Sequence, residues 1–274
     1  MTSIADVVLP KYRRRQPEFD AAVVESYLLG HSTRKSTRFL TGFLGELGIS
    51  HTTVSRILQR LDERAAAWRK RPLDKPFVYL WLDAKYARIH GATKRPYAVL
   101  FAYGATQQGE RELLGFQIQR SEGTAHWECM LNHLVSRGLD PQRLKLVIRD
   151  ENSGCDEAIL TILGEVPQQA CAVHLERNIA NMVSRPHRRQ FQNQLSEVFK
   201  QPSELQARRH LNAVFETWED LEHEACTALR ARVDRSLVFY RIATSARWRA
   251  HLKSTNLLER FYYAFAYDYN QRAA

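Results

Sequence analysis

The chain has 274 residues, 44% of them hydrophobic and 26% charged, which is enough apolar sequence for a substantial core. Its 40 Lys and Arg residues exceed its 30 Asp and Glu residues by ten, and this excess favours an anionic partner such as nucleic acid. No apolar run approaches the roughly 18 residues of a membrane span, and the first residues lack the order of a signal peptide. We therefore expect a cytoplasmic protein with no membrane contact.

Basic residues are concentrated near the N-terminus, where the first 75 residues hold fourteen Lys and Arg against eight Asp and Glu. Apolar residues recur at helical spacing on both sides of Gly48 and Ser50, which suit a helix end and the N-cap of the next helix. This pattern predicts a helix-turn-helix, whose second helix enters the major groove of DNA. The alternative is a helical hairpin with solvated basic faces. The expected DNA contacts are His51, Thr52, Thr53, Ser55 and Arg56.

The middle of the chain alternates between strand and helix patterns. Three β-rich runs come first, followed by a helix, the apolar run LKLVIRD, a second helix and the short run QQACAVH. This order, β-β-β-α-β-α-β, is that of a ribonuclease H-like core, a mixed sheet flanked by helices, and a generic α/β domain is the alternative. In chain order the patterns lie at about 74–90, 95–106, 110–120, 124–137, 144–150, 154–163 and 168–174.

Charged helical patterns follow, with no convincing strand, so we expect an α/β protein whose ribonuclease H-like sheet is interrupted by an all-helical insertion. The expected division has four parts. They are an N-terminal helical DNA-binding region at 1–73, core strands and helices at 74–173, the insertion at 174–246 and a final core helix at 247–274.

Two aspartates stand at the ends of strongly apolar runs, Asp83 after FVYLWL and Asp150 after LKLVIR. Open α/β sheets place functional groups at the carboxyl ends of their strands, and the first and fourth strands are neighbours in a ribonuclease H-like sheet. We therefore expect both carboxylates to converge on a divalent metal. The alternative is that each aspartate only caps the turn that follows it.

A third carboxylate is needed to hold two Mg²⁺ ions about 3.5–4 Å apart, the arrangement that clamps the attacking and leaving oxygens in phosphoryl transfer. Glu259 is the candidate, in a last helix that Ser254 or Thr255 is placed to N-cap. On spacing alone, Glu259 is an ordinary acid on a helix surface.

Three further residues are considered for functional roles. Cys171 and His174 form a C-x-x-H pair, which supplies only two of the four ligands of a structural zinc, so we expect reduced thiols and no zinc. His174 is expected to orient a backbone or phosphate group near the active site. For Trp248 we expect packing in the core, with stacking on a nucleotide base as the alternative.

Taken together, these segments resemble the bacterial Mutator-type insertion-sequence transposases, members of the group that uses an Asp-Asp-Glu triad. The resemblance runs along nearly the whole chain, through LPKYRRR, RPLD, YLWLDAKYARI, LVIRDENSG, CAVHLERN and STNLLER in this order. It implies that Asp83, Asp150 and Glu259 hold two Mg²⁺ or Mn²⁺ ions per active site. Cys171 and His174 would then belong to the family's Cys/Asp-x-x-His signature.

The resemblance also implies an activity and its partners. The activity is metal-dependent cleavage and transfer of DNA strands, and the partners are double-stranded DNA at the terminal inverted repeats of the transposon and target DNA. The protein would work on DNA as a homodimer or a larger assembly. A catalytically decayed DNA-binding fragment and a ribonuclease H-like nuclease are the two alternative functions.

Two features depart from the family pattern. Glu151 follows the second acid where the family usually has Gly, so the turn beside Asp150 is expected to differ. The chain stops at Ala274, shortly after the third acid, where the family continues with a basic helix and a tail. A truncated or decayed copy is therefore the alternative to an active enzyme.

Overall fold

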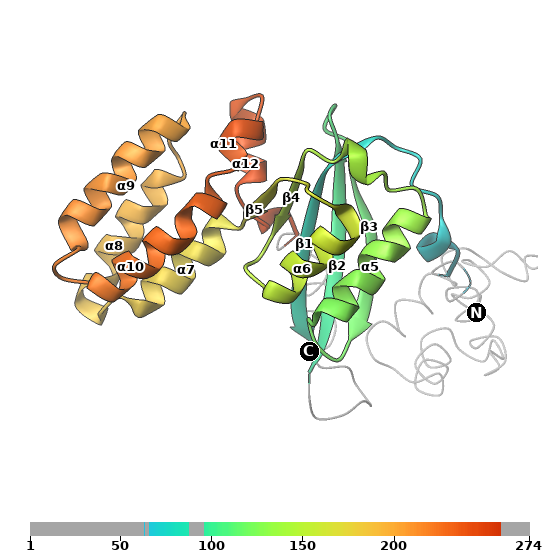
Figure 1. Cartoon of the computed structure of the whole chain (residues 1–274), viewed down its shortest axis with the longest axis horizontal. Coiled ribbons are helices and arrows are strands. Elements are labelled where there is room, and N and C mark those ends of the chain that lie inside the picture. The colour runs from blue at the N-terminus through green and yellow to red at the C-terminus, as the bar shows by residue number, and fades with distance from the viewer. Residues whose placement is uncertain (1–62, 64–65, 88–95, 259–274) are drawn as a thin grey trace, which may run out of the picture. The chain divides into compact units, whose positions relative to one another are not determined.

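The computed structural model describes residues 63, 66–87 and 96–258. The chain divides into two compact units, one of Met1–Arg71 with Tyr262–Ala274 and the other of Pro72–Phe261. Nearly all described residues belong to the second unit, whose elements are labelled in Figure 1. The predicted helix-turn-helix and Glu259 lie outside the described residues, so both stay predictions, and so do the four expected domains.

A five-stranded mixed sheet forms the centre of the second unit, in the order β3-β2-β1-β4-β5. β1 (Phe77–Ala87), β2 (Tyr97–Thr106) and β3 (Arg111–Gln119) form an antiparallel meander, as the three β-rich runs predict. β4 (Leu146–Arg149) pairs with β1 in parallel, and β5 (Gln168–Ala170) pairs with β4 in the same sense. The mixed α/β class is therefore confirmed.

Continuous apolar runs make β1 and β4 the buried centre of this sheet. Residues 79–82 of β1 have no exposed surface, and every residue of β4 is buried. A strand that is covered on both faces has no solvent side, so it lacks the alternation of polar and apolar residues. β2 by contrast alternates between buried and partly exposed positions over most of its length.

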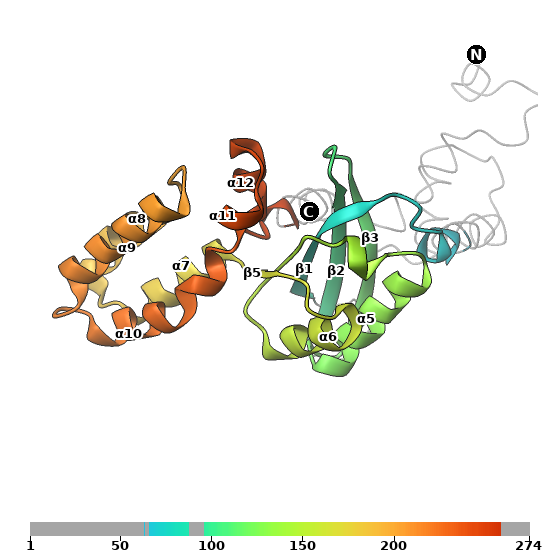
Figure 2. The same cartoon turned by 45° about the horizontal axis from the view of Figure 1, so that its top comes forward.

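Helices cover both faces of the sheet, as Figure 2 shows. α5 (Thr124–Ser136) and α6 (Ser153–Leu163) pack in one cluster with Leu80 and Leu82 of β1. On the other face, α12 (Ala246–Leu252) brings Trp248 against Tyr79, with 4.5 Å between ring centroids. Trp248 thus has the packing contact that we expect of it.

The remaining described elements are helical, in agreement with the predicted all-helical character of 174–246. No strand occurs among the described residues after β5, and no helix among them is both long and apolar enough to cross a membrane. These elements are α7 (Ala172–Met182), α8 (Arg185–Val198), α9 (Glu204–Trp218), α10 (His223–Arg232), the 3₁₀ turn η2 (Val233–Ser236) and α11 (Phe239–Ile242).

One boundary differs from the sequence expectation. The strand pattern expected through QQACAVH ends at Ala170, and α7 begins at Ala172 with Cys171 in the N-cap position. The backbone N–H of Cys171 still donates to the carbonyl of Arg149 on β4, but its carbonyl accepts from Leu175 N–H as the first helical hydrogen bond. Cys171 and His174 therefore lie at the start of a helix.

The side chain of Gln169 connects β5 to the chain that returns from the helical segment. This fully buried amide donates from Nε2 to the carbonyls of Ala170 at 2.7 Å and Ser236 at 2.8 Å. Its Oε1 accepts from the backbone N–H of Phe239 at 2.9 Å. Since buried polar groups must be hydrogen-bonded, Gln169 fixes where the returning chain meets the sheet.

Replacing Gln169 by leucine should destabilise the protein by about 2–4 kcal/mol, because Ser236 C=O and Phe239 N–H would lose a buried partner. Denaturant unfolding measures this loss. Gln192→Leu, at an exposed position of α8, is the matched control and should change stability by less than about 0.5 kcal/mol. Equal effects of the two substitutions would contradict the role given to Gln169.

Candidate active site

Asp83 and Asp150 occupy matching positions on two adjacent parallel strands. Leu82 of β1 pairs with Arg149, the last residue of β4, so Asp83 and Asp150 are the next residues along the two chains. Asp150 follows its strand as the sequence predicts, but β1 continues to Ala87, so the prediction that Asp83 ends its strand is wrong. Leu82 faces the cluster with α5 and α6, and successive side chains of a strand alternate, so Asp83 belongs to the face covered by α12. Asp83 is 7% exposed, whereas the side chain of Asp150 is 42% exposed.

Backbone hydrogen bonds orient both carboxylates. Oδ1 of Asp83 accepts from Ala84 N–H at 2.9 Å, and Oδ1 of Asp150 accepts from Glu151 N–H at 2.7 Å. Both contacts agree with the local capping role that the sequence left open. A carboxylate has two oxygens with about four lone-pair sites, so such a contact is compatible with metal binding.

His174 lies beside the second acid, with its Nδ1 3.4 Å from Oδ1 of Asp150. Burial lowers the pKa of His174, but the hydrogen bond and the charge interaction with Cys171, followed by the charges of Asp150 and Asp83, outweigh burial and raise it to about 9. The imidazole is therefore protonated at neutral pH. It places a positive charge next to the two carboxylates.

Cys171 connects the start of α7 to the chain before the last helix. Its buried Sγ accepts from the backbone N–H of Thr255 at 3.3 Å and from Thr255 Oγ1 at 3.5 Å. Ala172 N–H donates to the carbonyl of Lys253 at 2.9 Å. These contacts hold together two segments that lie 84 positions apart in the sequence.

The last helix begins directly after this contact. Residues 256–258 are helical, and Leu258 N–H donates to the carbonyl of Thr255 at 2.8 Å. Oγ of Ser254 accepts from Asn256 N–H at 3.4 Å. The structure thus places the start of this helix where the sequence predicts it, while Glu259 itself lies outside the described residues.

The two aspartates supply oxygen ligands of the kind that Mg²⁺ prefers. Among the described residues, no three His, Cys, Asp or Glu side chains lie close enough together to hold a metal ion. A magnesium site built on Asp83 and Asp150 would thus need a further donor, and Glu259 is the sequence candidate. The all-oxygen donor set fits Mg²⁺, so the expectation stands as a proposal.

Glu122 is an acid near this site that the sequence reasoning did not find. It stands in the turn before α5, and its Oε2 accepts from Nδ2 of Asn152 at 3.0 Å. Burial raises the pKa of Glu122, hydrogen bonds from Asn152 and Tyr86 oppose this rise, and the charge of Asp150 adds to it. A single acid in a polar turn carries no sequence pattern that marks it.

The turn after Asp150 has ionic contacts that reach the helical segment. Glu151, the residue that departs from the family pattern, forms an ion pair with Arg232 at the end of α10. Arg149 Nε lies 2.6 Å from Asp156 Oδ1, and Asp156 Oδ2 lies 3.5 Å from Arg235. The departure at Glu151 was visible in the sequence, but its partner 81 positions away was not.

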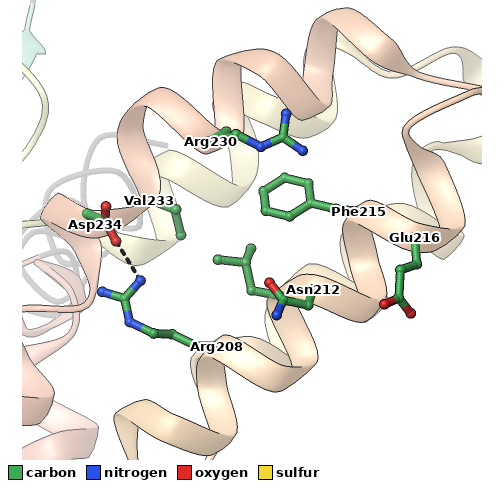
Figure 3. A pocket seen from close by; sticks show the side chains of 8 residues that line it. Arg208, Asn212, Phe215, Glu216, Arg230, Val233 and Asp234 are labelled. Atoms are coloured by element: carbon green, nitrogen blue, oxygen red, sulfur yellow. Dashed lines mark hydrogen bonds and ion pairs between the residues drawn. The ribbon is translucent and has the colours of Figure 1, made fainter.

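A pocket of about 440 Å³ lies elsewhere, in the helical segment (Figure 3). Arg208 pairs there with Asp234 at 2.8 Å, and Arg230 lies over the ring of Phe215 while pairing with Glu219 at 2.7 Å. Its lining includes neither Asp83 nor Asp150. Acids pair with both of its arginines, and the candidate site remains at the sheet.

Comparison with known proteins identifies relatives of the chain. A family model described as "Transposase, Mutator family" matches residues 3–264. The chain is 33% identical over 256 residues to the transposase for insertion sequence element IS406 of Burkholderia multivorans, an alignment that covers 92% of this chain and 64% of that protein.

Two further relatives extend the comparison. The chain is 29% identical over 257 residues to the transposase for IS256 in transposon Tn4001 of Staphylococcus aureus, covering 92% of this chain and 64% of that protein. It is 32% identical over 199 residues to the transposase for IS1081 of Mycobacterium tuberculosis, covering 72% and 47%. The chain thus spans less than two thirds of the length of these three relatives.

Replacing Cys171 by alanine should destabilise the protein by about 1–3 kcal/mol, because the buried N–H of Thr255 would lose its acceptor. Amide hydrogen exchange should show faster exchange at Thr255. Cys226→Ala, which removes another buried thiol from α10, is the control and should leave Thr255 exchange unchanged. Equal Thr255 exchange in both variants would mean that Cys171 does not hold this segment.

Glu176, on α7, gives the fold a dependence on pH. Burial raises its pKa from 4.5 to about 7, although Lys253 and Lys200 lower it. The folded state therefore binds this proton more tightly than the unfolded chain does. The resulting stability is present below pH 4.5 and is lost as pH rises through about 7.

Glu176→Gln should raise the free energy of unfolding at pH 8 by on the order of 2 kcal/mol, because no charge then has to be buried. At pH 4.5 the variant and the parent should differ little. Denaturant unfolding at both pH values measures the difference. Glu216→Gln, at an exposed position of α9, should change stability equally at the two values. A pH-independent effect of Glu176→Gln would show that this carboxyl is not the cause.

Proposed function

Because the chain belongs to the Mutator family of transposases, we propose that it carries the catalytic centre of a transposase that cleaves DNA strands at the ends of an insertion sequence and transfers them to target DNA. The observation that carries this proposal is the in-register placement of Asp83 and Asp150 on adjacent parallel strands. Such a placement brings the two carboxylates to neighbouring strands at the point where β4 ends.

The topology supports a finer description of the fold. β1, β2 and β3 form an antiparallel meander, and the parallel strands β4 and β5 are added next to β1. β1 therefore lies between β2 and β4. We take this order, with α5 and α6 on one face, as a ribonuclease H-like core. The sequence order of the elements favoured the same fold, and the adjacency of the first and fourth strands is the feature that the proposed site requires.

In this proposal, Asp83, Asp150 and Glu259 hold two Mg²⁺ or Mn²⁺ ions. When bound, the ions would activate the attacking hydroxyl of water or of a DNA 3′ end and stabilise the leaving 3′ oxygen. The backbone N–H groups of Ala84 and Glu151 keep the first two carboxylates oriented. One P–O bond forms as another breaks, so the protein needs no nucleophile of its own.

The partly buried imidazole of His174 lies beside the second acid. Its Nδ1 lies 3.4 Å from Oδ1 of Asp150. The low exposure of Asp83 limits the access of bulk water to the first acid. The chain thus orients two acids and balances part of their charge before any DNA binds.

DNA recognition completes the proposal. We expect His51, Thr52, Thr53, Ser55 and Arg56 to contact the terminal inverted repeats, with the net charge of +10 favouring the DNA backbone. We further expect two or more copies to act together on paired ends and target DNA.

The test is cleavage of DNA that carries the inverted repeats flanking the gene. Asp83→Asn and Asp150→Asn should each lower Mg²⁺-dependent cleavage by at least about 10²-fold, because they remove a negative ligand but preserve the acceptor for the backbone N–H. A mobility-shift assay should show unchanged DNA binding. Asp220→Asn, at an exposed position, is the matched control with cleavage unchanged.

The outcomes separate the alternative functions. Cleavage that survives in Asp83→Asn would remove this acid from the mechanism. Binding of the repeats without any Mg²⁺-dependent cleavage would indicate a DNA-binding fragment. Cleavage without strand transfer, and without preference for the repeats, would indicate a nuclease.

A further inference from the structure

We propose that Arg232 and Glu151 are positioning residues for Asp150, so that the helical segment sets the orientation of the second acid of the site. This inference rests on the proposed function for its catalytic consequence. Its structural part, the control of the Asp150 carboxylate by an ion pair with α10, can be tested without any activity.

Three consecutive residues carry the first step. Arg149 and Glu151 flank Asp150, and both are linked to the end of the helical segment: Glu151 by its ion pair with Arg232, and Arg149 through Asp156, which also pairs with Arg235. Asp150 is therefore held from both neighbours by contacts with residues 232–235.

A hydrogen bond transmits this hold to the carboxylate. The backbone N–H of Glu151 donates to Oδ1 of Asp150 at 2.7 Å, and His174 lies 3.4 Å from the same oxygen. A shift of Glu151 changes the direction of its N–H and therefore the position of this oxygen. The path runs from Arg232 through the Glu151 side chain and its backbone to Asp150.

Partial burial gives the ion pair its effect. The side chains of Glu151 and Arg232 are 14% and 31% exposed, so solvent screens their attraction less than it screens a surface pair. Loss of one partner leaves a partly buried charge that must find a new partner. If Glu151 loses its charge, the neighbouring carboxylate in the sequence is that of Asp150. Arg232 would then pair with Asp150 and turn this acid away from the site.

The helical segment does not depend on this pair for its attachment. Gln169 holds Ser236 and Phe239 through buried hydrogen bonds that involve neither Glu151 nor Arg232. Breaking the ion pair should therefore leave the fold in place while releasing the turn at Asp150. This separation distinguishes positioning from general stabilisation.

The test is a double-mutant cycle with Glu151→Gln, Arg232→Gln and the double variant, and with Arg232→Lys as the conservative change. Its matched control is the pair of Glu219 and Arg230, which joins the end of α9 to the same helix α10 at 2.7 Å. Glu219→Gln and Arg230→Gln remove the same charges without touching the turn after Asp150.

Amide hydrogen exchange of Glu151, measured by NMR on the protein without metal or DNA, is the first readout. Arg232→Gln should accelerate this exchange by about tenfold, Arg232→Lys should restore most of the protection, and Arg230→Gln should leave it unchanged. Protection that is equal in Arg232→Gln and the parent protein would overturn the inference, whatever the activity.

Cleavage as a function of Mg²⁺ concentration is the second readout. Glu151→Gln and Arg232→Gln should each raise the half-saturating Mg²⁺ concentration by about tenfold, while the rate at saturating Mg²⁺ changes less. The double variant should match either single variant. Unchanged Mg²⁺ dependence, alongside an inactive Asp150→Asn, would overturn this inference and leave the proposed function intact. An active Asp150→Asn would instead remove the proposed function.

Discussion

The parallel pairing of β1 with β4 is the constraint on which the rest of the structure depends. A parallel neighbour requires a crossover, and here the antiparallel meander and α5 fill the chain between the two strands. Because side chains alternate along a strand, a slip of one residue would move Asp83 from the α12 face to the face covered by α5 and α6. The register in which Leu82 pairs with Arg149 therefore decides on which face of the sheet Asp83 lies.

A second set of contacts brings distant segments to the same edge. Cys171 holds Thr255 at the start of the last helix, while His174, one helical turn after Cys171, faces Asp150. The C-x-x-H spacing thus places Cys171 against Thr255 and His174 against Asp150 from the first turn of α7. The contact of Cys171 with Thr255 joins parts of the chain that the helical segment separates, and the contact of His174 lies beside the second acid.

The sequence predicts the elements of this fold better than it predicts the contacts between them. The meander, α5 and α6 follow from local periodicity, and Asp83 and Asp150 are recognisable because each ends an apolar run. The early end of β5 is not predictable, since the pattern QQACAVH suits a strand as well as a helix start. Nor are the partners of Cys171 and Glu151, because a side-chain contact across more than 80 positions leaves no local pattern.

The two attachments of the helical segment to the sheet differ in their chemistry. Gln169 makes neutral, fully buried hydrogen bonds, on which dissolved ions have little effect. The ionic contacts of residues 232–235 include Arg235, whose side chain is 66% exposed and therefore open to screening. Ionic strength thus acts on one attachment and spares the other. Added salt therefore weakens the charged contacts of residues 232–235, while the hydrogen bonds of the buried Gln169 amide keep their strength.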